Sequence, residues 1–231
     1  METVILARTL QLKRPKSIPY TQIICILAIF GFAQFIVVTF VAAALYPGGY
    51  DYFGYFFSDL GTTRARNGDP NIISSLLFSI SFVSLIICLF PFWFAIITIF
   101  HRTMGERRLS IYGSLSGLIS FIFGLGVVIY PMDTHFEEHR FFAVLFFSFL
   151  AIAILLYSFA FLLNTNYSNY YSFLSFGLFI LLGFFETVTF GNYQAFVQKI
   201  IFYYLFLWVL IQIVHLWPLI SLQSKYQVNS K

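Results

Sequence analysis

Apolar residues occur along this chain in six long runs, and short polar segments separate one run from the next. The runs cover residues 23–45, 72–100, 109–130, 141–163, 170–189 and 196–222. A helix of about 20 mostly apolar residues crosses roughly 30 Å of hydrocarbon. The pattern therefore predicts an all-α, polytopic membrane protein with six transmembrane helices in one bundle. We expect this domain to occupy residues 21–222, between an N-terminal segment, 1–20, and a tail, 223–231.

Composition agrees with a membrane protein. Hydrophobic residues make up 60% of the chain, charged residues only 10%, and the mean hydropathy is +0.86. Soluble domains carry about 25% charged residues, so a soluble fold of this length could not cover its apolar surface. The first run is also too long for the apolar core of a signal peptide, and we expect it to remain as the first helix.

Charge differs between the two sets of connections. Nine of the 13 Lys and Arg residues lie in the N-terminal segment, the second-to-third helix loop and the tail. Seven of the nine Asp and Glu residues lie on the other side. Because positive residues stay inside, both termini are predicted to be cytoplasmic, in a multi-pass protein of the cell membrane. The net charge of +4 then reports topology and not nucleic-acid binding.

The longest outer connection covers residues 46–70. Pro47, Gly48 and Gly49 end the first helix, since proline cannot continue a helical ladder and glycine tolerates a tight turn. The aromatic stretch 50–57 is expected at the outer membrane interface, either re-entrant or lying on the surface. Asn71 is placed to cap the second helix.

A possible metal pattern follows the third run. His135, Glu138 and His139 form H-x-x-E-H, and on a helix residues four apart share a face. Zinc would need a further ligand, and Asp59, Asp133 and Glu186 are all expected at the same membrane face. A short polar loop of this composition is more often only a solvated connection, which is the favoured interpretation.

Several short motifs resemble an uncharacterised membrane family catalogued as domain of unknown function 998. They are Tyr46-Pro47-Gly48 with Tyr50, Ser58-Asp59-Leu60-Gly61, Asn71, Tyr130-Pro131-Met132-Asp133, His139 before Phe141, and Gln198-Lys199 with Trp208. Lys199 stands where the family tends to have Arg. The resemblance covers nearly the whole chain and implies a six-helix bundle without an established activity. It places one polar cluster at the outer face: Ser58, Asp59, Asp133, His139, Gln198 and Lys199.

Three functional hypotheses remain. The favoured one is a bundle whose outer polar cluster ties helix ends together and binds a lipid or small ligand. In it, Asp59 or Asp133 pairs with Lys199 or Arg140, and His139 bridges them. The alternative is a metal-dependent membrane hydrolase acting at the outer leaflet, with zinc as its cofactor. A transporter is least favoured, because few polar groups fall near the middle of the bilayer. We otherwise expect no cofactor, membrane lipids as partners and no nucleic acid; the oligomeric state stays open.

Overall fold

The computed structural model describes residues 20–187 and 191–229 of the chain. Within these residues six helical segments are long and apolar enough to cross a membrane, which confirms the predicted multi-pass membrane protein. The elements are α2 (Tyr20–Ala44), η1 (Phe57–Gly61), α3 (Ile72–Leu89), α4 (Phe92–Ile97), α5 (Met104–Ile129), α6 (Phe136–Leu163), α7 (Asn169–Thr187), η2 (Gly191–Tyr193) and α8 (Gln194–Asn229).

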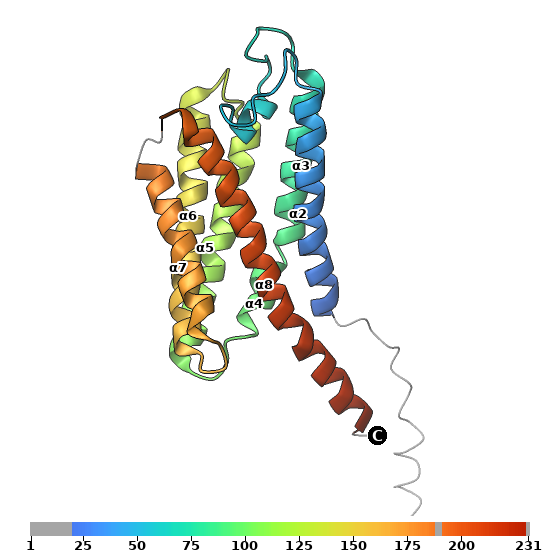
Figure 1. Cartoon of the computed structure of the whole chain (residues 1–231). Helices are drawn as coiled ribbons and strands as arrows, with labels where there is room; N and C mark the ends of the chain where they lie inside the picture. The colour runs from blue at the N-terminus through green and yellow to red at the C-terminus, as the bar shows by residue number, and fades with distance from the viewer. Residues whose placement is uncertain (1–19, 188–190, 230–231) are drawn as a thin grey trace, which may run out of the picture.

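The helices form one elongated bundle (Figure 1). Helix α2 packs along α3, α5 packs along α6, and α6 packs along α7. Helix α8 crosses the bundle and contacts α2 on one side and α7 on the other. Helix α2 begins and α8 ends at the same end of the bundle, as six crossings require. The connection 46–70, which we call the cap, lies at the opposite end, the cap end.

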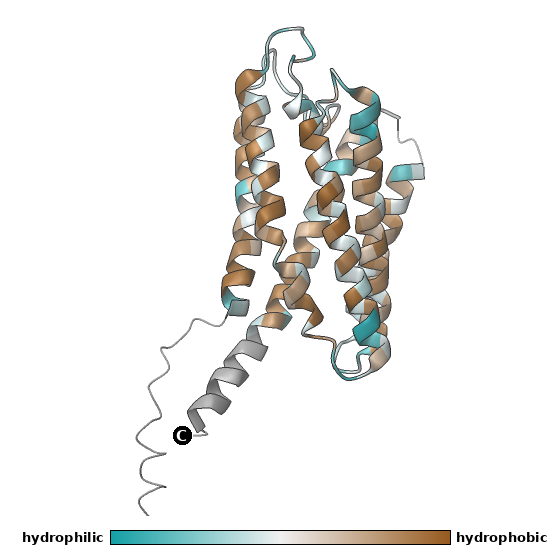
Figure 2. Cartoon of the chain, turned by 180° about the vertical axis from the view of Figure 1, so that it is seen from behind, coloured by the Kyte–Doolittle hydropathy of each residue, from teal (hydrophilic) through white to brown (hydrophobic). Residues whose placement is uncertain are grey.

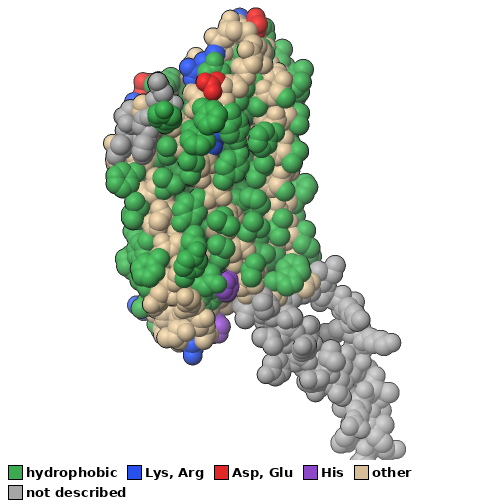
Figure 3. All heavy atoms as spheres, in the orientation of Figure 1, with side chains coloured by type: hydrophobic (Ala, Val, Ile, Leu, Met, Phe, Trp, Pro, Cys, Tyr) green, Lys and Arg blue, Asp and Glu red, His purple; other side chains and the backbone are tan. Residues whose placement is uncertain are grey.

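Polar residues are concentrated at the two ends of the bundle. Brown, apolar ribbon fills the middle of the helices in Figure 2, and teal residues lie mainly in the connections. On the face shown in Figure 3, apolar side chains cover the central band, with coloured charges at the ends. This distribution is typical of a surface that lipid solvates in the middle and water at both ends.

Proline interrupts the second crossing, which the sequence pattern predicts as one run. Helix α3 ends at Leu89 and α4 begins at Phe92, with Pro91 between them. Proline has no N–H to donate and its ring clashes with the preceding turn, so the helix breaks there. The Pro91 carbonyl instead accepts the N–H groups of Phe94 and Ala95 at 3.2 Å.

Helix α5 begins with a reciprocal cap. The Thr103 hydroxyl accepts the Glu106 N–H at 3.2 Å, and the Glu106 carboxylate accepts the Thr103 N–H at 3.0 Å. The backbone N–H groups of Thr103 and Glu106 would otherwise be unpaired donors at the start of the helix. The Glu106 side chain is also buried, and its role is to stabilise the start of α5.

Small residues let α5 approach its neighbours closely. A Cβ atom added to Gly117 would lie 2.4 Å from Trp93 Cε2, and one added to Gly126 would lie 2.2 Å from Phe142. Gly113 faces Tyr157 of α6 in the same way, at 3.0 Å. The glycines therefore make room for aromatic rings, in the close packing that small residues allow between membrane helices.

Candidate functional site

The cap packs onto the helix ends, where η1 contacts α2, α3 and α8. Its short helix η1 enters the bundle and buries Phe57, Ser58, Asp59 and Leu60. Asn71 precedes α3, but its side chain makes no helix-cap hydrogen bond. The amide of Asn71 donates instead to the carbonyls of Leu60 and Thr62, both at 3.0 Å. The predicted capping role of Asn71 is therefore wrong, because its side chain holds η1 in place.

A partly buried ion pair joins η1 to the following part of the cap. Asp59 Oδ1 accepts Arg66 Nε at 2.8 Å, and Asp59 Oδ2 accepts the Phe56 N–H at 2.7 Å. The Asp59 side chain is 2% exposed and that of Arg66 is 50% exposed. The Arg66 guanidinium also lies over the Tyr55 ring, 4.9 Å from its centre. Its bond to Asp59 raises the pKa of Arg66 above the ordinary value.

Asp133, in the turn between α5 and α6, binds the same part of the cap at Thr63 and Arg64. Its carboxylate accepts the Thr63 N–H at 3.1 Å, the Thr63 hydroxyl at 2.6 Å and the Arg64 N–H at 3.0 Å. Partial burial alone would raise the pKa of the Asp133 carboxyl. The hydrogen bonds from Thr63 and Arg64 outweigh burial and hold this pKa below its ordinary value.

Lys199, on α8, holds the aromatic part of the cap. The side chain is fully buried, and its ammonium donates to the Tyr55 carbonyl and, at 3.3 Å, to the Ala195 carbonyl. The rings of Tyr50, Tyr52 and Phe57 surround the charge, with centres 5.0 to 5.4 Å away. A cation among ring faces gains electrostatic attraction that partly offsets its loss of water.

The predicted pairing within the cluster therefore needs correction. We expected Asp59 or Asp133 to pair with Lys199 or Arg140 and His139 to bridge them. In the described residues Asp59 pairs with Arg66, and Lys199 binds carbonyl groups and aromatic rings. Asp59 still acts on Lys199 electrostatically, but through space and not through contact.

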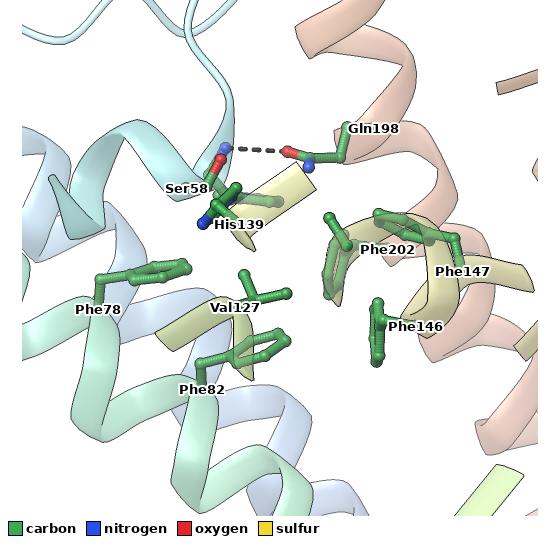
Figure 4. Close-up of a pocket in the computed structure, with 11 residues that line it drawn as sticks. Ser58, Phe78, Phe82, Val127, His139, Phe146, Phe147, Gln198 and Phe202 are labelled. Carbon is green, nitrogen blue, oxygen red and sulfur yellow. Dashed lines mark hydrogen bonds between the residues drawn. The ribbon is translucent and has the colours of Figure 1, made fainter. Parts of the chain in front are cut away.

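Ser58, His139 and Gln198 line one small cavity beneath η1 (Figure 4). The cavity holds about 30 Å³, and its other walls are apolar side chains, mainly phenylalanines of α3, α6 and α8. Gln198 Oε1 accepts the Phe57 N–H at 2.9 Å, which ties η1 to α8. This volume suits about two water molecules and no larger ligand.

The orientation of His139 follows from its partner. Its Nδ1 lies 2.8 Å from the Tyr130 carbonyl oxygen, which can only accept a hydrogen bond. Nδ1 must therefore carry a proton, and in the neutral ring Nε2 is the acceptor. His139 thus links the start of α6 to the end of α5, and its imidazole is part of the wall under the cap.

The proposed metal ligands do not converge. No group of three or more His, Cys, Asp or Glu side chains in residues 20–187 and 191–217 is placed to hold a metal ion. His135 precedes α6 with φ −136° and ψ 58°, so it does not share a helical face with His139. His135 contacts the Thr134 hydroxyl at 2.9 Å, Glu138 is exposed, and Glu186 lies on α7.

A larger hollow opens above η1 at the cap end. It has a volume of about 580 Å³, within the range of about 300–1,000 Å³ typical of small-molecule sites. We call it the bowl. One wall is the cap, through Tyr46, Phe56, Asp59, Thr62, Thr63, Arg64, Ala65 and Arg66. The other is the α5–α6 connection and the start of α6, through Met132, Asp133, Thr134 and Phe136.

The charged groups of the bowl are not equally available. Both oxygens of Asp59 and both oxygens of Asp133 already accept hydrogen bonds within the protein. Arg66 uses only Nε, and its terminal nitrogens have no hydrogen-bond partner among the residues that the structure describes. The Arg64 side chain is exposed and donates one bond, from Nη1 to the Gly68 carbonyl at 2.9 Å. The donors of two arginines therefore remain accessible, while the carboxylates are occupied.

Sequence reasoning singled out Asp59 and Asp133 but missed Arg66 and Thr63, which bind them. It also missed Tyr55, whose carbonyl binds Lys199. No motif marks these residues. The one available signal was formal charge, since Arg64 and Arg66 stand among the acidic residues of the outer connection.

A comparison with protein families finds one matching family, described as protein of unknown function DUF998, over residues 29–215. The match runs from within the first crossing to within the last, and it includes the cap and both walls of the bowl. No curated protein matches the chain. No solved structure matches it either.

Proposed function

Because this chain belongs to the DUF998 family of membrane proteins, whose description names no activity, we propose a function from the bowl itself: a membrane-embedded binding protein for a small ligand. The bowl of about 580 Å³ carries this proposal. It is large enough for a small molecule, and it combines apolar walls with convergent polar groups, as ligand sites usually do.

The surrounding contacts support a preformed site. Asp133 holds the cap at Thr63 and Arg64, the Asp59–Arg66 pair joins η1 to the same part of the cap, and Lys199 anchors the cap to α8. The contacts of Asp133 and Lys199 link the cap to residues far away in the sequence, which supports a bowl that is formed before a ligand binds. A preformed site loses less conformational entropy on binding than a flexible loop does.

The proposal places the cap outside the cell. The support is the distribution of charge, since Lys and Arg gather in the connections at the opposite end of the bundle. A ligand would then come from the outer solution or from the outer leaflet, where the bowl meets the headgroup region.

Filling the bowl tests this function. Thr134 lines the bowl and is exposed, so Thr134→Trp would occupy it with an indole ring. Native mass spectrometry of the purified protein should show a co-purified small molecule on the wild type and less of it on Thr134→Trp. Glu137→Trp, on an exposed residue outside the bowl, is the matched control and should retain the adduct. Equal adducts on both variants would contradict the proposal.

The metal-dependent hydrolase stays a separate hypothesis. It needs His135, Glu138 and His139, with Glu186, to close around an ion, and these side chains do not do so in the described residues. Elemental analysis of the purified protein tests it directly. Stoichiometric zinc whose removal lowers thermal stability would favour the hydrolase over the binding protein.

A further inference from the structure

From the placement of the arginine donors we infer that the bowl recognises an oxyanion, a phosphate or carboxylate group, through Arg66 with help from Arg64. This inference rests on the proposed binding function and specifies the chemistry of the ligand. It follows from which polar atoms of the bowl are free to bind, and not from its formal charge, which is zero for two arginines and two aspartates.

The negative groups of the bowl are masked. Asp59 is almost completely buried and accepts bonds from Arg66 Nε and the Phe56 N–H. Asp133 is exposed, but Thr63 and Arg64 donate to both of its oxygens. These internal hydrogen bonds partly offset the charge of each carboxylate, so both are weaker ligands for a cation than free carboxylates would be.

Arg66, by contrast, is fixed and available. Its backbone N–H donates to the Tyr46 hydroxyl at 3.0 Å, its Nε binds Asp59, and its guanidinium lies over the Tyr55 ring. These three contacts fix the orientation of the planar group while half of the side chain remains exposed. A guanidinium presents its N–H groups as a rigid fork that matches two oxygens of a carboxylate or phosphate.

Arg64 adds a second positive charge from the same wall. Its side chain is exposed and lines the bowl two residues before Arg66. Thr134 lies on the opposite wall, where its hydroxyl, 2.9 Å from His135 Nδ1, is a neutral polar group. Phe56, Met132 and Phe136 supply apolar surface between them, which suits an anionic group attached to a carbon skeleton.

Two sources can supply this chemistry: a free phosphate compound and the headgroup of an anionic lipid. We would titrate the full-length protein in a non-ionic detergent with inorganic phosphate and, separately, with dihexanoyl phosphatidic acid, using isothermal titration calorimetry. Saturable binding of phosphate supports the inference with a soluble ligand. Binding of the short-chain lipid alone supports it with a lipid headgroup. Absence of both would overturn it.

A pair of neutral substitutions tests the assigned residue. Arg66→Gln with Asp59→Asn removes both charges and retains a side-chain hydrogen bond, so it avoids leaving a buried carboxylate unpaired. Anion affinity should fall about tenfold or more, because a charge-assisted bidentate contact is lost. Arg64→Gln should weaken binding less, and its effect should shrink as salt rises. Arg140→Gln, on an exposed arginine outside the bowl, is the control and should bind as the wild type does.

The results separate this inference from the function on which it rests. Unchanged anion affinity in the Arg66→Gln, Asp59→Asn variant, with wild-type thermal unfolding, would overturn the assignment to Arg66. A co-purified ligand that Thr134→Trp expels but the neutral pair retains would overturn the anion chemistry and leave the binding function intact. Anion binding that ignores Thr134→Trp would overturn both.

Discussion

The attachment of the cap to the α5–α6 connection can be broken at one residue. Asp133→Ala removes a carboxylate that accepts three hydrogen bonds, from the Thr63 N–H, the Thr63 hydroxyl and the Arg64 N–H. Each such bond contributes about 0.5–1.5 kcal/mol net, and exposure of Asp133 places these nearer the lower figure. The sum predicts about 2 kcal/mol less stability for the closed cap, a roughly 30-fold larger open population.

Hydrogen–deuterium exchange measures this opening. Cap residues 62–70 should exchange faster in Asp133→Ala, while α5 and α6 keep their protection, because only the cap loses contacts. Exchange of the cap in Asp133→Asn should lie between that of the wild type and that of Asp133→Ala. The amide oxygen can still accept the Thr63 N–H, but the NH₂ group cannot accept the Arg64 N–H. Glu137→Ala, on an exposed neighbour, is the control. Wild-type exchange of residues 62–70 in a folded Asp133→Ala protein would refute the reasoning.

Three further predictions concern pH, the buried lysine and the glycines of α5. Because hydrogen bonds lower the pKa of Asp133, its contribution to cap closure should be complete above the ordinary pKa of 3.8 and lost as the pH falls through the lower pKa of the folded protein. Cap opening that already increases as the pH falls to about 6 would contradict this. Lys199→Met should lower the unfolding temperature in detergent, since the Tyr55 carbonyl loses its donor at a cost of about 1–3 kcal/mol, and Lys199→Arg should recover part of the lost stability. An unchanged unfolding temperature in Lys199→Met would rule out the anchoring role. Gly117→Val should destabilise the protein by forcing Trp93 aside, whereas Gly183→Val should not, because Gly183 has open space around it. Equal melting temperatures of the two variants would contradict the packing of α5.

The membrane crossings could be predicted because they depend on length and apolarity, which are local properties. The interruption at Pro91 was also visible in the sequence as a proline within an apolar run. The continuous hydrophobicity of residues 72–100 favours a single helix, but the helix ends at Leu89 and resumes at Phe92.

The partners within the site could not be predicted in the same way. Asp59 and Lys199 carry opposite charges at one end of the bundle, so pairing them was reasonable. The folded cap brings Arg66 to Asp59 and gives Lys199 a carbonyl and three aromatic rings instead. Which of several nearby charges meets a carboxylate depends on the path of an irregular loop, and neither periodicity nor spacing encodes that path.

The H-x-x-E-H pattern shows how one boundary changes a site. The metal hypothesis assumed that His135 and His139 lie on one helix. Helix α6 begins at Phe136, so His135 lies outside it, while His139 turns towards the Tyr130 carbonyl. Helix boundaries are the least certain part of a sequence-based assignment, and here a helix that begins one residue after His135 separates the two imidazoles.

Cysteine labelling in intact cells tests the central claim most directly, namely that this bundle spans the membrane with the cap and its bowl outside. In a background with Cys25→Ala and Cys88→Ala, Asp69→Cys would report the cap and Ser168→Cys the opposite end, since both residues are exposed. A membrane-impermeant maleimide should label Asp69→Cys before cell lysis and Ser168→Cys only after it. Labelling of Ser168→Cys in intact cells, with Asp69→Cys protected, would contradict the account.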